Sequence, residues 1–163
     1  MPLGPTSTLA MSHFRPIAGQ IALEIQVFQI FKKATERYSK SNKVPGGIYC
    51  MGKSLRAMNM PESAIKILRE GLQAFPVDDT AGKMAFEIGM CYFDKGDYCL
   101  AYNAFDSFVK QYPQDELVVE AMIVMSDSLL NDKKYVEATN SYFGLLKTSN
   151  SDDIRRYAFN RIG

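Results

Sequence analysis

The stretch from residue 85 to residue 113, AFEIGMCYFDKGDYCLAYNAFDSFVKQYP, decides the fold of this chain. In its first half, apolar and small residues such as Ile88 and Gly89 recur at the spacing of one face of an α-helix. A polar turn at residues 95–97 separates this half from a second half with the same helical spacing. Pro113 cannot continue a helix and ends the stretch. The stretch therefore predicts two helices joined as a hairpin.

The pattern recurs elsewhere in the chain with a period of 37 residues. The small residue of the first helix stands at Gly52, Gly89 and Ser126, since 52, 89 and 126 differ by 37 each time. Three further columns keep the period, namely Ala64, Ala101 and Ala138, then Leu68, Phe105 and Tyr142, and finally Pro76 and Pro113. Small residues on facing helices let the two backbones approach closely, and the larger side chain fills the space beside them. The columns therefore predict an all-α stack of helical hairpins.

The columns also predict how the chain is divided. We expect a loose leader at 1–15, an amphipathic helix at 16–41, hairpin units at 45–81, 82–118 and 119–155, and the first part of a fourth unit, or a capping helix, at 156–163. The last of these expectations rests on Gly163, which continues the column of small residues. The apolar side chains of the 16–41 helix cover about twice the arc of a simple surface helix. This helix is either a degenerate second helix of an earlier unit or a self-association surface through residues 17–38.

The repeat resembles the tetratricopeptide repeat, in which a bulky–small pair and then Tyr or Leu mark the first helix, and Ala, Phe and a terminal Pro mark the second. The second unit matches best, at Ile88, Gly89, Tyr92, Gly96, Tyr98, Ala101, Phe105 and Pro113. The period exceeds the usual value of about 34 residues. The first unit departs from the pattern at Pro61 and the third at Ser126. The resemblance implies a right-handed α-solenoid that holds a protein or peptide partner and has no catalytic role.

The resemblance also implies which side chains face a partner, because the family uses four places of each first helix for this purpose. In this chain those places hold Tyr49, Lys53, Arg56, Lys83, Phe86, Met90, Phe93, Glu120, Ile123, Asp127 and Leu130. This surface would have a basic end, an aromatic and methionine-rich middle, and an acidic far end. The alternative is that some of these side chains are covered by the turn of the superhelix or by the amino-terminal helix.

Chaperone-binding members of the family clamp a peptide carboxylate with Lys, Asn and Arg side chains. The corresponding places here hold Tyr49, Lys53, Glu87, Glu120 and Val124, of which only one is basic. The sequence thus argues against binding of a chaperone tail.

A second resemblance concerns residues 101–113 followed by Glu120 and Ala121. This run is similar to repeats of bacterial envelope-assembly proteins, namely the periplasmic coordinator of the Tol–Pal system and the outer-membrane assembly lipoproteins. We recognise no export signal in the sequence, and the cysteine count is odd. These two features favour a cytoplasmic location, with a periplasmic one open if an export signal is missing from this chain.

The composition argues against several other classes of function. Nineteen basic residues balance 18 acidic ones, so we expect no nucleic-acid partner. No run approaches the roughly 18 apolar residues of a membrane span. His13 is the one histidine, and the glycines stand singly, so the sequence predicts no metal site, cofactor or catalytic residue. The acidic pairs 78–79 and 152–153 lie at expected turns, where helix capping explains them.

The three cysteines, Cys50, Cys91 and Cys99, lack the spacing of metal ligands. They are expected to be small buried side chains in a reducing compartment. A disulfide between Cys91 and Cys99 across a hairpin is the alternative.

Overall fold

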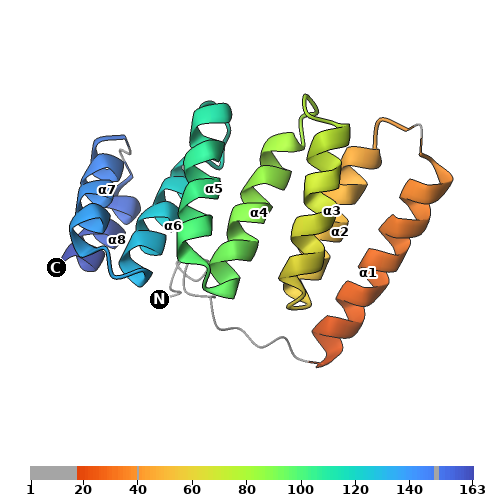
Figure 1. The fold of residues 1–163 in the computed structure, drawn as a ribbon, viewed down its shortest axis with the longest axis horizontal. Helices are drawn as coiled ribbons and strands as arrows, with labels where there is room; N and C mark the ends of the chain where they lie inside the picture. The colour runs from red at the N-terminus through yellow and green to blue at the C-terminus, as the bar shows by residue number, and fades with distance from the viewer. Residues whose placement is uncertain (1–17, 40, 149–150) are drawn as a thin grey trace.

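The computed structural model describes residues 18–39, 41–148 and 151–163, and in this part of the chain all regular structure is helical (Figure 1). The described helices are α1 (Ala18–Arg37), α2 (Val44–Ala57), α3 (Pro61–Ala74), α4 (Ala81–Lys95), α5 (Tyr98–Gln111), α6 (Val118–Asn131), α7 (Tyr135–Thr148) and α8 (Asp152–Ile162). They form an elongated row with α1 at one end and α7 and α8 at the other. The predicted all-α helical-repeat solenoid is confirmed.

The predicted divisions of the chain relate to these helices as follows. The leader predicted at 1–15 lies outside the described residues. The helix predicted to reach residue 41 is shorter, because α1 ends at Arg37. Beyond it the Ser41 hydroxyl accepts a hydrogen bond of 3.2 Å from the Lys43 amide, and Pro45 in the first turn of α2 starts a new helix. The limits of the repeat units stay a prediction.

The small residues of the first helices lie where the second helices approach closely. A Cβ atom added at Gly52 would lie 2.4 Å from the Leu68 side chain, and one at Gly89 would lie 2.7 Å from the Phe105 ring. In the third hairpin Ser126 fills this place, and its hydroxyl lies 2.7 Å from that of Ser141. The column of small residues is therefore a steric requirement of the hairpin.

Each of the hairpins α2–α3, α4–α5 and α6–α7 turns on a residue in the left-handed region. These residues are Asn59 with φ 59°, Gly96 with φ 82° and Lys133 with φ 61°. Their numbers again differ by 37. Glycine and asparagine adopt this conformation readily, whereas lysine does so at an energetic cost. The third turn thus keeps the geometry of the others without their favourable residue.

Three apolar cores follow one another along the stack. The residues of the alanine column and of the Leu68, Phe105 and Tyr142 column are at most 1% exposed. Backbone contacts link α2 to α4 and α4 to α6, whereas within the described residues the second helices touch one another only through first helices. The first helices therefore lie closer together and form the inner side of the stack.

Candidate protein-binding surface

Arg56 in the last turn of α2 connects the first two inner helices. Its Nε atom donates to Glu87 Oε2 of α4 at 2.7 Å, and its Nη1 atom lies 2.9 Å from Asp94 Oδ2, further along α4. The Glu87 side chain is only 6% exposed, whereas those of Arg56 and Asp94 are 24% and 29% exposed. A charge-assisted contact of this kind is stronger than a neutral hydrogen bond. It fixes α2 against α4 on the inner side.

Glu87 is also the centre of a group of side chains from three successive inner helices. Burial and then the negative charge of Glu87 raise the pKa of the Tyr49 hydroxyl in α2. The same two causes raise the pKa of the Glu120 carboxyl in α6, with Arg56 acting in the opposite direction. Electrostatic coupling falls off with distance, so the charge of Glu87 acts on side chains of both neighbouring inner helices. We call Tyr49, Arg56, Glu87, Asp94 and Glu120 the inner-face cluster.

The other sequence-predicted residues of the inner side differ in their exposure. Lys53 is exposed, whereas Met90, Phe93 and Leu130 are half-buried or pack at the edges of the apolar cores. The Phe93 ring meets the Tyr98 ring edge-on with 5.6 Å between centroids. Lys83 Nζ lies 3.4 Å from Glu116 Oε1 in an exposed ion pair, which holds its side chain only weakly.

Two of the residues predicted to face a partner are instead core residues. Phe86 is 6% exposed and Ile123 is 4% exposed. The Phe86 ring packs edge-on against the rings of Phe105 and Phe108 of α5, at centroid distances of 5.3 and 5.8 Å. Ile123 belongs to the third core, together with Tyr142 of α7. Both side chains are thus covered by the second helix of their own hairpin, whereas Tyr49, at the same place of α2, stays half-buried.

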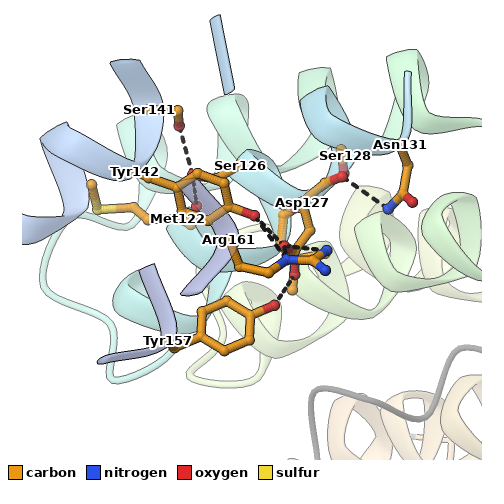
Figure 2. A network of polar contacts seen from close by, with 10 residues as sticks. Met122, Ser126, Asp127, Ser128, Asn131, Ser141, Tyr142, Tyr157 and Arg161 are labelled. Carbon is orange, nitrogen blue, oxygen red and sulfur yellow. Dashed lines mark hydrogen bonds and ion pairs between the residues drawn. The ribbon is translucent and has the colours of Figure 1, made fainter. Parts of the chain in front are cut away.

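Asp127 is also turned into the protein, where it joins α6 to α7 and α8 (Figure 2). Its carboxylate accepts hydrogen bonds from the Tyr142 hydroxyl and, at 2.6 Å, from the Tyr157 hydroxyl. Arg161 Nη2 lies 3.0 Å from Asp127 Oδ1. Burial and then the hydrogen bond to Asp127 raise the pKa of both tyrosine hydroxyls. Asp127, which was predicted to belong to the acidic far end of the partner surface, therefore makes buried contacts that hold α8 against α6.

The sequence reasoning missed the roles of Glu87, Asp94 and Arg161. A usable signal is present, because each contact joins opposite charges on neighbouring first helices. Arg56 and Glu87 are 31 residues apart, and Asp127 and Arg161 are 34 residues apart, which is close to one repeat in both cases. Opposite charges separated by about one repeat on first helices thus indicate an ion pair between them.

The three cysteines are free, and the predicted alternative of a bridge between Cys91 and Cys99 is not what the structure shows. Cys91 is buried, and burial raises the pKa of its thiol to about 12. Cys50 is half-buried and Cys99 is exposed, so the expectation that all three are buried holds only for Cys91.

Within residues 18–39, 41–148 and 151–163, no group of His, Cys, Asp and Glu side chains is arranged to hold a metal ion. No helix in the same part of the chain has the length and apolar character needed to cross a membrane.

Comparison with known proteins identifies the repeat and the fold. A model of the tetratricopeptide repeat family matches residues 85–115. No curated protein matches the sequence. A solved structure from Podosopora anserina, described as a putative kinesin light chain with nearly identical TPR-like repeats, superposes with a TM-score of 0.67 at 12% identity over 88% of this chain and 82% of that one. A substituted variant of the same protein gives the same score at 9% identity over the same shares of the two chains.

A double mutant of MamA from RS-1 superposes with a TM-score of 0.58 at 12% identity, over 90% of this chain and 94% of that one. At such identities these structures establish the fold alone. The resemblance to envelope-assembly proteins stays a prediction.

Proposed function

We propose that this tetratricopeptide-repeat chain is a protein-interaction scaffold that holds a peptide or protein partner against the inner face of α2, α4 and α6. Tetratricopeptide repeats are commonly interaction modules, and stacked helical repeats present extended concave surfaces for this purpose. The inner-face cluster and Lys53 are the residues with which the partner would make its polar contacts. The chain carries out no chemical step in this proposal.

The observation that supports this function most strongly is the environment of Glu120. Its carboxyl is half-buried and lies near the negative charge of Glu87, so its pKa is raised. Arg56 compensates Glu87 and Asp94 directly, whereas Glu120 lies on the next inner helix, α6, outside this contact. A positively charged group of a partner placed between Glu87 and Glu120 would relieve this repulsion. The half-buried Tyr49, Met90 and Phe93 would supply the apolar contacts beside it.

Two charge-exchange variants test the proposal. The first, Lys53→Glu with Glu120→Lys, changes the inner face and leaves the net charge unchanged. The second, Lys66→Glu with Glu137→Lys, makes the same exchange at exposed positions of the second helices α3 and α7 and serves as the control. We expect the first variant to lose the partner that the unmodified chain retains, and the second to keep it. Equal binding by both variants would contradict the proposal, provided that circular dichroism shows both to be folded.

Self-association through α1 is a second candidate function, favoured by the exposed apolar side chains of that helix. Leu23 is 58% exposed and Ile30 is 65% exposed, and the two lie seven residues apart on one side of α1. Light scattering tests this candidate, since a chain that stays at its monomer mass of 18.3 kDa at high concentration does not self-associate.

A further inference from the structure

A groove lies on the outer side of the stack between the second helices α5 and α7. Within the described residues these two helices make no direct backbone contact, and both pack on α6. The space between them is a cavity of about 620 Å³, which is within the size range of ligand-binding pockets. Tyr98, Tyr102 and Asn103 of α5 line one wall, and Asn140 of α7 lines the other. The buried Leu129 of α6 lines the base.

The corresponding space one period earlier lies between α3 and α5, and there a side chain spans it. Lys95 is the last residue of α4. Its Nζ atom lies 3.3 Å from Glu62 Oε1 of α3 and 2.9 Å from Asp97 Oδ2, which directly precedes α5. One ammonium group thus joins α3 to the start of α5.

Between α5 and α7 the same three places hold Cys99, Asp132 and Lys134. Lys134 Nζ lies 2.7 Å from Asp132 Oδ2, so the ion pair on the turn is kept with its charges exchanged. Cys99 stands at the place of Glu62, and its side chain is shorter and carries no carboxylate. The groove between α5 and α7 therefore stays open at the point where its neighbour is bridged.

Two amide side chains line this groove from its opposite walls. Asn103 and Asn140 are one period apart, and both are exposed. Among the described residues, Asn140 has no hydrogen-bond partner for its amide, and the Asn103 amide meets only the Cys99 sulfur, at 4.0 Å. A side-chain amide carries the same donor and acceptor groups as a peptide bond. Two such amides can therefore pair with the backbone of an extended chain of any sequence.

The charges and rings beside the amides favour a basic residue in such a chain. Lys134 is already paired with Asp132, whereas Glu137 of α7 makes no ion pair with any described residue. The half-buried rings of Tyr98 and Tyr102 line the opposite wall. They can cover the apolar stem of a lysine or arginine whose charged end reaches Glu137.

We propose that the groove between α5 and α7 binds an extended segment of a partner protein that contains lysine or arginine. Asn103 and Asn140 form hydrogen bonds with the backbone of this segment, and Glu137 pairs with its basic side chain. The site lies on the outer side of the stack, so it is independent of partner binding at the inner face and of self-association through α1. It leaves the inner face free for a different partner.

The first test titrates the chain with a defined probe, the blocked peptide Ser-Val-Lys-Val-Ser, and follows the side-chain amide signals by NMR. The β-branched valines favour the extended form, and the lysine is complementary to Glu137. We expect the signals of Asn103 and Asn140 to shift, and the same peptide with glutamate in place of lysine to bind more weakly. Asparagine signals that do not move, or equal binding of the two peptides, would overturn the proposal.

The second test closes the groove with the contact that bridges its neighbour. The triple variant Cys99→Glu, Asp132→Lys and Lys134→Asp reproduces the arrangement found between α3 and α5, and it adds one negative charge. Charge alone would strengthen binding of the basic probe, whereas loss of the open space should weaken it by about tenfold or more. Unchanged or tighter binding by this variant, with circular dichroism showing it to be folded, would contradict the proposed site.

The third test removes the two amides and compares the result with a matched control. The double variant Asn103→Ala and Asn140→Ala should bind the probe about tenfold more weakly, because it loses the hydrogen bonds to the backbone. The control, Gln73→Ala with Gln111→Ala, removes two exposed amides of α3 and α5 that lie outside the groove and should bind as the unmodified chain does. Equal affinity of the two folded variants would exclude the asparagine pair as the binding element.

Discussion

Replacing Asp127 with alanine should cost the protein a measurable part of its stability and loosen α8. The Asp127 side chain is 6% exposed, and it accepts hydrogen bonds from Tyr142, Tyr157 and Arg161. Tyr142 is 1% exposed, so its hydroxyl would lose its acceptor in a place that water reaches poorly. Leaving such a buried donor unpaired costs about 1–3 kcal/mol.

The ion pair with Arg161 adds to this cost. Breaking a buried pair costs about 3–5 kcal/mol, but the Arg161 side chain is 37% exposed and water compensates part of its loss. We therefore expect a total of about 3 kcal/mol. For a chain of this length about 1 kcal/mol corresponds to 2–4 °C, so the melting temperature should fall by about 6–12 °C.

Thermal unfolding followed by circular dichroism measures this change, and hydrogen exchange of the α8 amides locates it. The control is Asp132→Ala, just beyond the carboxyl end of α6, whose exposed ion pair with Lys134 should contribute little to stability. A melting temperature for Asp127→Ala within about 1–2 °C of the control, with unchanged protection of α8, would show that Asp127 does not hold α8 in place.

Local geometry supports three further predictions. Lys133→Gly should raise the free energy of unfolding in urea by about 0.5–1 kcal/mol. The left-handed conformation costs lysine about 1–2 kcal/mol, and the greater conformational entropy of glycine in the unfolded chain offsets part of the stabilisation. Gly89→Ala should destabilise it by about 1–3 kcal/mol through the clash with Phe105, whereas Gly144→Ala, with nothing within 4 Å, should be neutral or stabilising in the same assay. The pKa of Glu120 is raised in the folded state, so the folded chain holds this proton more tightly than the unfolded chain, and stability falls as the pH rises above the ordinary glutamate pKa. Glu120→Gln should therefore raise the free energy of unfolding at neutral pH by less than about 1 kcal/mol. In acid below the ordinary glutamate pKa, the same variant should leave the free energy of unfolding unchanged.

The hairpins were predictable because the requirement for them is local and repeated. A small residue at Gly52, Gly89 or Ser126 is needed wherever a second helix crosses closely, and the period of the columns records this need three times. Such columns therefore indicate the fold even where the units differ at other positions. The three left-handed turn residues keep the same period, although lysine at position 133 is not a residue type that indicates a left-handed conformation.

The candidate site was predictable only in part, because exposure depends on how far each helix is covered by its neighbours. Arg56 does contact Glu87 on the inner side, and both charges act on the pKa of the Glu120 carboxyl. Phe86 and Ile123 occupy equivalent places of their helices, and both are buried under the second helix of their hairpin. Position in the repeat alone does not show how deeply that helix covers them.

Asp127 shows the second limit of the sequence reasoning. Its place in α6 corresponds to Lys53 in α2 and Met90 in α4, of which one is exposed and the other half-buried. What distinguishes Asp127 is the pair Tyr157 and Arg161 on α8, which come from a different helix and have no counterpart in the columns. Contacts between neighbouring first helices depend on residues about one repeat apart, and such pairs are visible in a sequence only when both partners are considered together.

The most direct test of the proposed function is hydrogen exchange of the chain with its bound partner. If the partner lies on the inner face, amides of α2, α4 and α6 should gain protection around the inner-face cluster, while those on the exposed sides of α3, α5 and α7 should exchange as in the free chain. Protection confined to the second helices, with α2, α4 and α6 unchanged, would contradict the account.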